Sequence, residues 1–142
     1  MDLKKLIATN DSWGLLVLRL VTGTIFIAHG LPKFGLGGDS GLAELAGWLG
    51  SIGIPLPMLN AILLASSEAI GGAMLLIGFL TRFAAATQVI AMLVAVFLVH
   101  YSNGLAGEGG YQWALLLGAA AFALMMDGAG RLSVDRMMSD KH

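Results

Sequence analysis

The sequence predicts an all-α fold in which four helices span a membrane as a bundle, and three observations lead to this fold class. First, 57% of the 142 residues are hydrophobic and 12% are charged, whereas soluble domains are about half apolar and about a quarter charged. Second, four apolar segments approach the length of about 20 residues that a helix needs to cross a bilayer. Third, most cationic residues fall on one side of these segments. We therefore expect a single domain, residues 1–142, embedded in a lipid bilayer.

The predicted spans are helical because a helix satisfies its own backbone polar groups in lipid. Small residues of the second span, Ala61, Ala65, Gly71 and Gly72, would allow a neighbouring backbone to approach closely. The four predicted spans are residues 13–31, 59–80, 83–101 and 111–126, and a tail of residues 127–142 follows them.

The connection between the first two spans carries a shorter amphipathic pattern. Leu42, Leu45, Ala46 and Leu49 recur there at helical spacing. A helix of about residues 40–52 is too short to cross a bilayer. We therefore expect a short interfacial or re-entrant helix between the first and second spans.

The distribution of cations predicts the orientation of the chain. Of the eight Lys and Arg residues, Arg19 lies inside the first predicted span and Lys33 follows that span. The other six share the opposite side from Lys33 if the chain crosses four times: Lys4, Lys5, Arg82, Arg131, Arg136 and Lys141. The positive-inside rule then places both termini in the cytoplasm and predicts a multi-pass protein of the bacterial inner membrane.

Composition also excludes several classes of function. The formal net charge of −1 gives no broad basic field, so nucleic acid is not an expected partner. The chain has no cysteine, which rules out disulfides, an internal thiol redox centre and a thiolate metal site. No nucleotide-binding glycine motif and no GxSxG motif is present.

Three polar residues lie at membrane depth in the predicted spans. Arg19 is about six residues, or about 9 Å, inside the first span. Glu68 lies near the midplane of the second span, and Gln88 lies on the third. Charged residues inside a membrane are usually paired or face a cavity. The sequence therefore predicts a buried network of Arg19, Glu68 and Gln88 that fixes helix register, with the alternative that Glu68 also handles protons or a ligand.

A second polar group is predicted at the opposite boundary of the bilayer from the cationic side. His29 and His100 end the first and third spans at matching depth. Lys33, Tyr101 and Tyr111 lie at the same level. One interpretation is an interfacial belt of aromatic residues with a snorkelling lysine.

Three functional interpretations of this group remain open. The histidines and aromatic residues could bind a quinone head group. The two histidines could ligate a haem iron, or they could hold a divalent metal together with Glu44 or Glu108. Haem and metal are the weaker alternatives, because neither an HxxxH nor an HExxH spacing occurs. We predict no metal site.

Several segments resemble the DoxX family of small membrane proteins. They occur in family order over about residues 13–136: LRLVTG, AHGLPKF, GIPLP, SSEAIGGAMLLIGFLTRFAA, FLVHYSNG and GGYQWALLLGAAAFALMMDGAGRLSVD. The most specific parts are the block from Glu68 to Arg82 and the closing block from Gly128 to Asp135. The resemblance implies a four-span bundle, in agreement with the reading of the spans.

The resemblance also implies site residues and a functional context. The positions that match the motifs are Arg19, His29, Lys33, Glu68, Arg82, His100, Arg131 and Asp135. Some relatives are regarded as subunits of quinone-linked sulfur oxidation, and others as membrane partners in redox-stress complexes. Because this chain lacks cysteine, any sulfur chemistry would need a partner protein. In the tail, Arg131 and Asp135 are expected to contact each other at i, i+4.

The sequence thus predicts an accessory membrane subunit of a quinone-linked redox system, with a quinone or other apolar ligand bound near Glu68 and the histidines. A self-sufficient oxidoreductase is less favoured, because no electron carrier is visible in the sequence. The alternatives are a transporter of small molecules or lipids and a structural scaffold. Homo-oligomers and a soluble or membrane redox partner are compatible with each.

Overall fold

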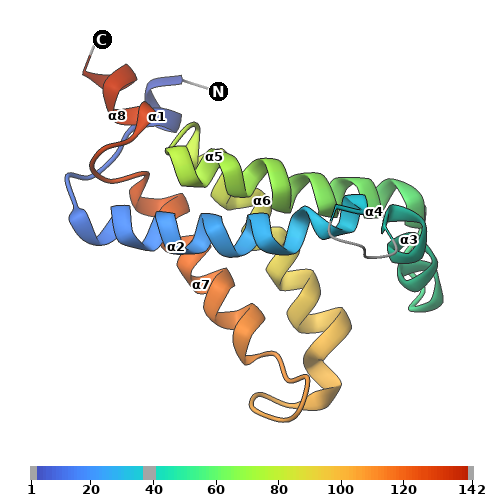
Figure 1. The fold of residues 1–142 in the computed structure, drawn as a ribbon. Helices are drawn as coiled ribbons and strands as arrows, with labels where there is room; N and C mark the ends of the chain where they lie inside the picture. Colours follow the sequence, from blue (N-terminus) through green and yellow to red (C-terminus); the bar gives the residue numbers. More distant parts are fainter. Residues whose placement is uncertain (1–2, 37–40, 141–142) are drawn as a thin grey trace.

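The computed structural model describes residues 3–36 and 41–140, and within them it contains helices and no strands (Figure 1). These described residues form eight α-helices, two π-helical turns (η2 and η3) and two short 3₁₀ turns (η1 and η4). The elements are α1 (Leu3–Ile7), α2 (Trp13–Gly30), η1 (Pro32–Phe34), α3 (Gly41–Ser51), α4 (Pro57–Ser66), η2 (Ser67–Gly71), α5 (Gly72–Ile77), α6 (Thr81–Val94), η3 (Ala95–His100), η4 (Tyr101–Asn103), α7 (Gln112–Asp127) and α8 (Val134–Ser139).

In the described part of the chain, three continuous helical stretches are long and apolar enough to cross a membrane: Trp13–Phe34, Pro57–Ile77 and Thr81–Asn103. They correspond to the first three predicted spans. The fourth predicted span forms α7, whose 16 residues make it shorter than the others. The structure therefore confirms an all-helical fold with three to four helices suited to a membrane bundle.

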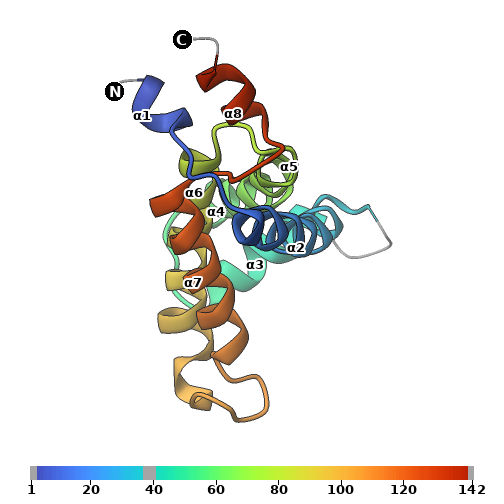
Figure 2. The same ribbon diagram turned by 90° about the vertical axis from the view of Figure 1, so that its left-hand side faces the viewer.

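The spans form two antiparallel pairs (Figure 1). Helix α2 lies beside α4, η2 and α5, and α6 lies beside α7. The pairs come together near the end of the molecule that carries α1 and α8, which we call the tail end. They diverge toward the opposite end, which we call the open end: in Figure 1 the first pair runs across the view while α6 and α7 run downward, and Figure 2 shows the first pair nearly end-on.

Small residues bring the first pair into close contact, as the sequence predicts. A Cβ atom added to Gly72 would lie 2.9 Å from the backbone nitrogen of Ile27, and one added to Gly30 would lie 2.8 Å from Cα of Ala69. Backbone atoms cannot move aside as a flexible side chain can. Glycine at these positions is therefore what allows α2 to pack directly on α5 and η2.

A continuous apolar interior joins the two pairs. Its fully buried members include Phe26 of α2, Leu75 of α5 and Leu124 of α7. A smaller cluster holds α3 in place, since Ala46 and Leu49 pack on Ala61. The helix predicted at about residues 40–52 is thus present as Gly41–Ser51, and residue 40 lies outside the described residues.

Candidate ligand site

A cavity of about 340 Å³ lies where the two helix pairs diverge. We call it the inter-pair cavity. All four spans and α3 contribute to its wall, and its volume is in the range of small-molecule sites. Most of the lining is apolar or aromatic, and the polar members are Glu68, Lys33, His29 and His100. The fold therefore brings together in one cavity four polar residues that are distant in the sequence, the first and last of them, His29 and His100, being separated by 71 positions.

An ion pair between Lys33 and Glu68 lies at this cavity. The Lys33 ammonium donates a hydrogen bond to Oε2 of Glu68. The Glu68 side chain is only 6% exposed, and that of Lys33 is 24% exposed. A carboxylate this buried requires a partner, because removing its water shell is costly. Lys33 supplies that partner and leaves ammonium hydrogens for a ligand.

The end of α2 explains how Lys33 reaches Glu68. Helix α2 stops at Gly30, and Pro32 opens the 3₁₀ turn that carries Lys33. Without a side chain at Gly30, the Glu68 turn sits directly against α2; an added Cβ would lie 2.8 Å from the Glu68 carbonyl carbon. The close approach and the turn together bring the lysine over the carboxylate.

Both π-helical turns border the inter-pair cavity. Glu68 lies in η2, and His100 ends η3. In η2 the Ser67 carbonyl accepts a hydrogen bond from Nε2 of Gln88, which is fully buried on α6. Gly71 leaves room for this amide, since an added Cβ would lie 2.6 Å from Nε2. Such turns occur frequently at functional sites.

In both histidines, ring nitrogen Nδ1 lies at hydrogen-bonding distance from a backbone carbonyl oxygen of another residue. Nδ1 of His29 lies 2.9 Å from the Ile25 carbonyl oxygen, and Nδ1 of His100 lies 2.8 Å from that of Gly109. A carbonyl oxygen can only accept, so Nδ1 carries the proton in each bond. In a neutral ring Nε2 is then an acceptor, suited to a ligand hydroxyl.

Aromatic side chains form part of the cavity wall, although not all of those expected. Trp48 of α3 and Trp113 of α7 line it together with Phe26. Tyr101 and Tyr111 stack on each other instead, with ring centroids 6.1 Å apart, and do not line it. Trp48 was not among the predicted site residues; its position beside Leu45 and Leu49 on the amphipathic pattern is the sequence signal for its place in the wall.

The predicted network of Arg19, Glu68 and Gln88 is corrected by the structure. Arg19 donates to the carbonyls of Leu75, Leu76 and Leu132, at 3.4, 3.2 and 3.1 Å, and Glu68 pairs with Lys33. The antiparallel register places Arg19 opposite the end of α5, while Gly30 lies opposite Glu68. Leu75 is seven residues beyond Glu68, about 10 Å along the helix. Arg19 therefore belongs to the tail end.

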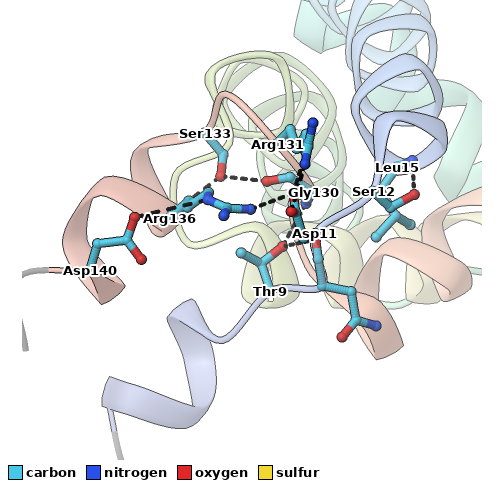
Figure 3. Close-up of polar contacts among 10 residues, drawn as sticks. Thr9, Asp11, Ser12, Leu15, Gly130, Arg131, Ser133, Arg136 and Asp140 are labelled. Atoms are coloured by element: carbon cyan, nitrogen blue, oxygen red, sulfur yellow. Dashed lines mark hydrogen bonds and ion pairs between the residues drawn. The ribbon is translucent and has the colours of Figure 1, made fainter.

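A polar cluster closes the tail end (Figure 3). Asp11 accepts hydrogen bonds from Arg131 and Arg136, whose side chains converge on it. The Arg131 guanidinium also lies 5.2 Å from the Trp13 ring centroid. The hydrogen bond from Arg131 is the main cause that lowers the pKa of Asp11 to about 2. This cluster attaches the tail to the start of α2.

Asp135 of the tail caps the start of α6, which corrects the expected Arg131–Asp135 contact. Asp135 accepts hydrogen bonds from the backbone nitrogens of Leu80 and Thr81, at 2.7 and 2.8 Å, where α6 begins. Arg82 donates to the carbonyls of Met125 and Met126 at the end of α7, and to that of Ala8. These motif residues thus have structural partners far from the cavity.

A more open pocket of about 470 Å³ adjoins the cavity. His29, Lys33 and Trp48 line both, and Glu44 lines only the open pocket. Within residues 3–36 and 41–140, no group of three or more His, Cys, Asp or Glu residues could hold a metal ion. The open pocket therefore connects Lys33 and His29 to the surface.

Comparison with known proteins relates this geometry to a family. The family model described as DoxX matches residues 14–101, a range that includes all four polar residues of the cavity. The "Putative oxidoreductase CatD" of Bacillus subtilis is 33% identical over 111 residues, 78% of each chain.

Two Escherichia coli proteins are similar over nearly their whole length. The "Inner membrane protein YphA" is 30% identical over 128 residues, 86% of this chain and 88% of the relative. The "Inner membrane protein YqjF" is 31% identical over 130 residues, 90% of this chain and 94% of the relative. No solved structure shows significant similarity.

Proposed function

We propose a function for this chain from the premise that it belongs to the DoxX family of multi-pass membrane proteins. It binds a quinone in the inter-pair cavity and serves as the accessory membrane subunit of a redox system. The single observation that carries the proposal is the convergence of Lys33, Glu68, His29 and His100 on one aromatic cavity. An apolar pocket with a few converging polar groups is the usual form of a small-molecule site. A relative named as an oxidoreductase supports the redox context.

The polar groups match both redox forms of a quinone. The Lys33 ammonium can donate to a quinone carbonyl oxygen. Nε2 of either histidine can accept a hydrogen bond from a quinol hydroxyl, because Nδ1 of each ring bonds a backbone carbonyl. The same nitrogen is placed to take up the hydroxyl proton when the quinol is oxidised.

Electron transfer requires a second protein. Oxidation of a quinol releases both hydroxyl protons and a pair of electrons, and the histidines and Glu68 offer basic sites for the protons. The sequence shows no electron carrier, so the electrons pass to a redox partner protein of the complex. This division of roles is why we propose an accessory subunit.

The proposed location is the bacterial inner membrane with both chain termini in the cytoplasm. Supporting it, α1 and α8 lie together at the tail end, where Arg82, Arg131 and Arg136 also lie. The names of the two Escherichia coli relatives point to the inner membrane. Helix α3 then lies at the outer boundary, interfacial or re-entrant, with the inter-pair cavity below it.

Co-purification of a quinone tests this function. We expect protein isolated in mild detergent to yield a near-stoichiometric quinone on solvent extraction and mass spectrometry. Glu68→Gln should lower the yield, because Lys33 loses its charged partner and its position. The matched control is Glu108→Gln in the exposed loop, which should retain the ligand. A yield of phospholipid alone, unchanged by Glu68→Gln, would favour the transporter or scaffold alternatives.

A further inference from the structure

We infer that the bound ligand is an amphiphile whose apolar chain lies in a groove between α6 and α7, with its polar head in the inter-pair cavity. This inference rests on the proposed quinone site and adds the class of quinone, one with a long chain that enters from the bilayer. The juxtaposition that carries it is a wholly apolar groove that meets a polar cavity.

The groove between α6 and α7 has a volume of about 270 Å³ and is lined by apolar residues alone. Leu93, Leu115 and Phe122 form its rim, and each is about half exposed, at 50%, 50% and 51%. Side chains of this kind on a membrane-spanning pair face lipid. The groove therefore opens to the bilayer and offers no hydrogen-bonding side chain to a polar ligand.

The groove and the inter-pair cavity are contiguous, because Met92 and Ala114 line both. Met92 is a flexible side chain at their junction. Gly118, one helical turn after Ala114, leaves space for it, since an added Cβ would lie 3.2 Å from Cβ of Met92. A chain lying along α6 and α7 past Met92 would thus reach the cavity that holds Lys33 and Glu68.

The two compartments differ in chemistry as the two ends of an amphiphile do. The cavity offers an ammonium, a carboxylate and two imidazoles to a polar head. The groove offers Val, Leu, Met, Ala, Gly and Phe to a chain. The occupant we propose for the groove is the chain of the quinone whose head occupies the cavity.

Photo-crosslinking tests this inference. The probe is a decyl-benzoquinone with a diazirine on its chain, added to the full-length protein in nanodiscs. Mass spectrometry locates the labelled residues, and excess unlabelled decyl-benzoquinone is the competitor. We expect label on the α6–α7 groove, at residues such as Leu93 and Leu115, that the competitor removes.

Two matched variants sharpen the test. Ala119→Phe fills the groove wall and should lower the competed groove label several-fold. Ala73→Phe, an exposed alanine of α5 that lines neither the groove nor the inter-pair cavity, should leave it unchanged. Competed label confined to other helices would overturn the groove while leaving the quinone site intact. If the competitor does not remove the label from the groove, the contact is nonspecific and lipid-like, and the groove is overturned as a binding site. If the competitor removes label from no residue of the protein, the quinone site itself is contradicted.

Discussion

Single polar side chains, each with a defined partner, organise the membrane-embedded part of this protein. Glu68 pairs with Lys33 at the cavity, and Arg19 binds backbone carbonyls at the other end of the same helix pair. Removing one member of a buried pair leaves the other without compensation for its lost hydration. The effects of substitution at these residues are therefore expected to exceed those at neighbouring apolar positions.

Lys33→Met tests the ion pair. We expect it to lower the free energy of unfolding by about 3 kcal/mol, because the Glu68 carboxylate remains buried without its partner. Adding Glu68→Leu should recover part of the loss, and Lys33→Arg should cost little. Unfolding in mixed detergent micelles measures all of these. A loss in the double variant equal to the sum of the losses of Lys33→Met and Glu68→Leu alone would show that the pair does not couple.

Asp135→Ala tests the cap at the start of α6. The carboxylate accepts from two backbone N–H groups and is buried. Loss of a helix cap costs about 1–2 kcal/mol, and we expect the upper part of that range. The control is Asp140→Ala, an exposed carboxylate of the same tail, which should be near neutral in the same unfolding experiment. Similar losses from both would assign the effect to net charge.

Sequence reasoning identified the polar residues of the cavity but not their pairing. His29, Lys33, Glu68 and His100 were all candidate site residues, but the partner expected for Glu68 was Arg19 and not Lys33. Depth along a helix can be counted from the sequence, but the register between two helices cannot. That register depends on the Gly30–Ala69 contact, which is visible only in three dimensions.

At the scale of elements, the close approach of α2 to α5 and η2 determines the shape of the cavity. Gly30→Ala should be strongly destabilising, because its Cβ would overlap backbone atoms of Glu68 and Ala69. The control is Gly47→Ala in α3, where an added Cβ meets nothing within 4 Å and helix propensity should give a gain of up to about 1 kcal/mol. In thermal unfolding we expect Gly30→Ala to lower the midpoint temperature and Gly47→Ala to raise it. An unchanged midpoint in Gly30→Ala would contradict the close packing of α2 on η2.

The elements themselves were largely predictable. Apolar length gave the spans, and the amphipathic spacing of Leu42, Leu45 and Leu49 gave α3. The π-helical turns were not predicted; in η2 the Ser67 carbonyl accepts a hydrogen bond from Gln88 of α6, a contact between helices that the sequence does not show. The second span also ended at Ile77 and not at residue 80, since Gly78 adopts a φ of 70°.

At the scale of the whole molecule, the two ends have different tasks. The tail end is closed by polar contacts that join α1, α2, the α5–α6 turn, α7 and α8. The open end holds the cavity between diverging helix pairs. The polar contacts that close the tail end are therefore separate from the residues that line the cavity.

The pH dependence of tail attachment follows from Asp11. Its pKa is lowered from 3.8 to about 2 in the fold, so the contribution of its ion pairs is present above about pH 4 and is lost as the pH falls toward 2. Since the chain has no cysteine, Met137→Cys on α8 can carry a single fluorophore. Its anisotropy should stay constant from pH 7 to about 4 and fall below that. With Asp11→Asn added, anisotropy should be low throughout; an unchanged profile would contradict the account.

The measurement that tests the central claim most directly is tryptophan quenching by a quinone. Trp48 and Trp113 line the inter-pair cavity, while Trp13 lies beside Arg131 at the tail end. Variants that keep one tryptophan each, with Phe at the other two positions, are titrated with decyl-benzoquinone in nanodiscs. We predict saturable quenching of Trp48 and Trp113 and only weak, linear quenching of Trp13. Linear quenching of similar strength at all three positions would show a quinone dissolved in the bilayer and contradict a site between the helix pairs.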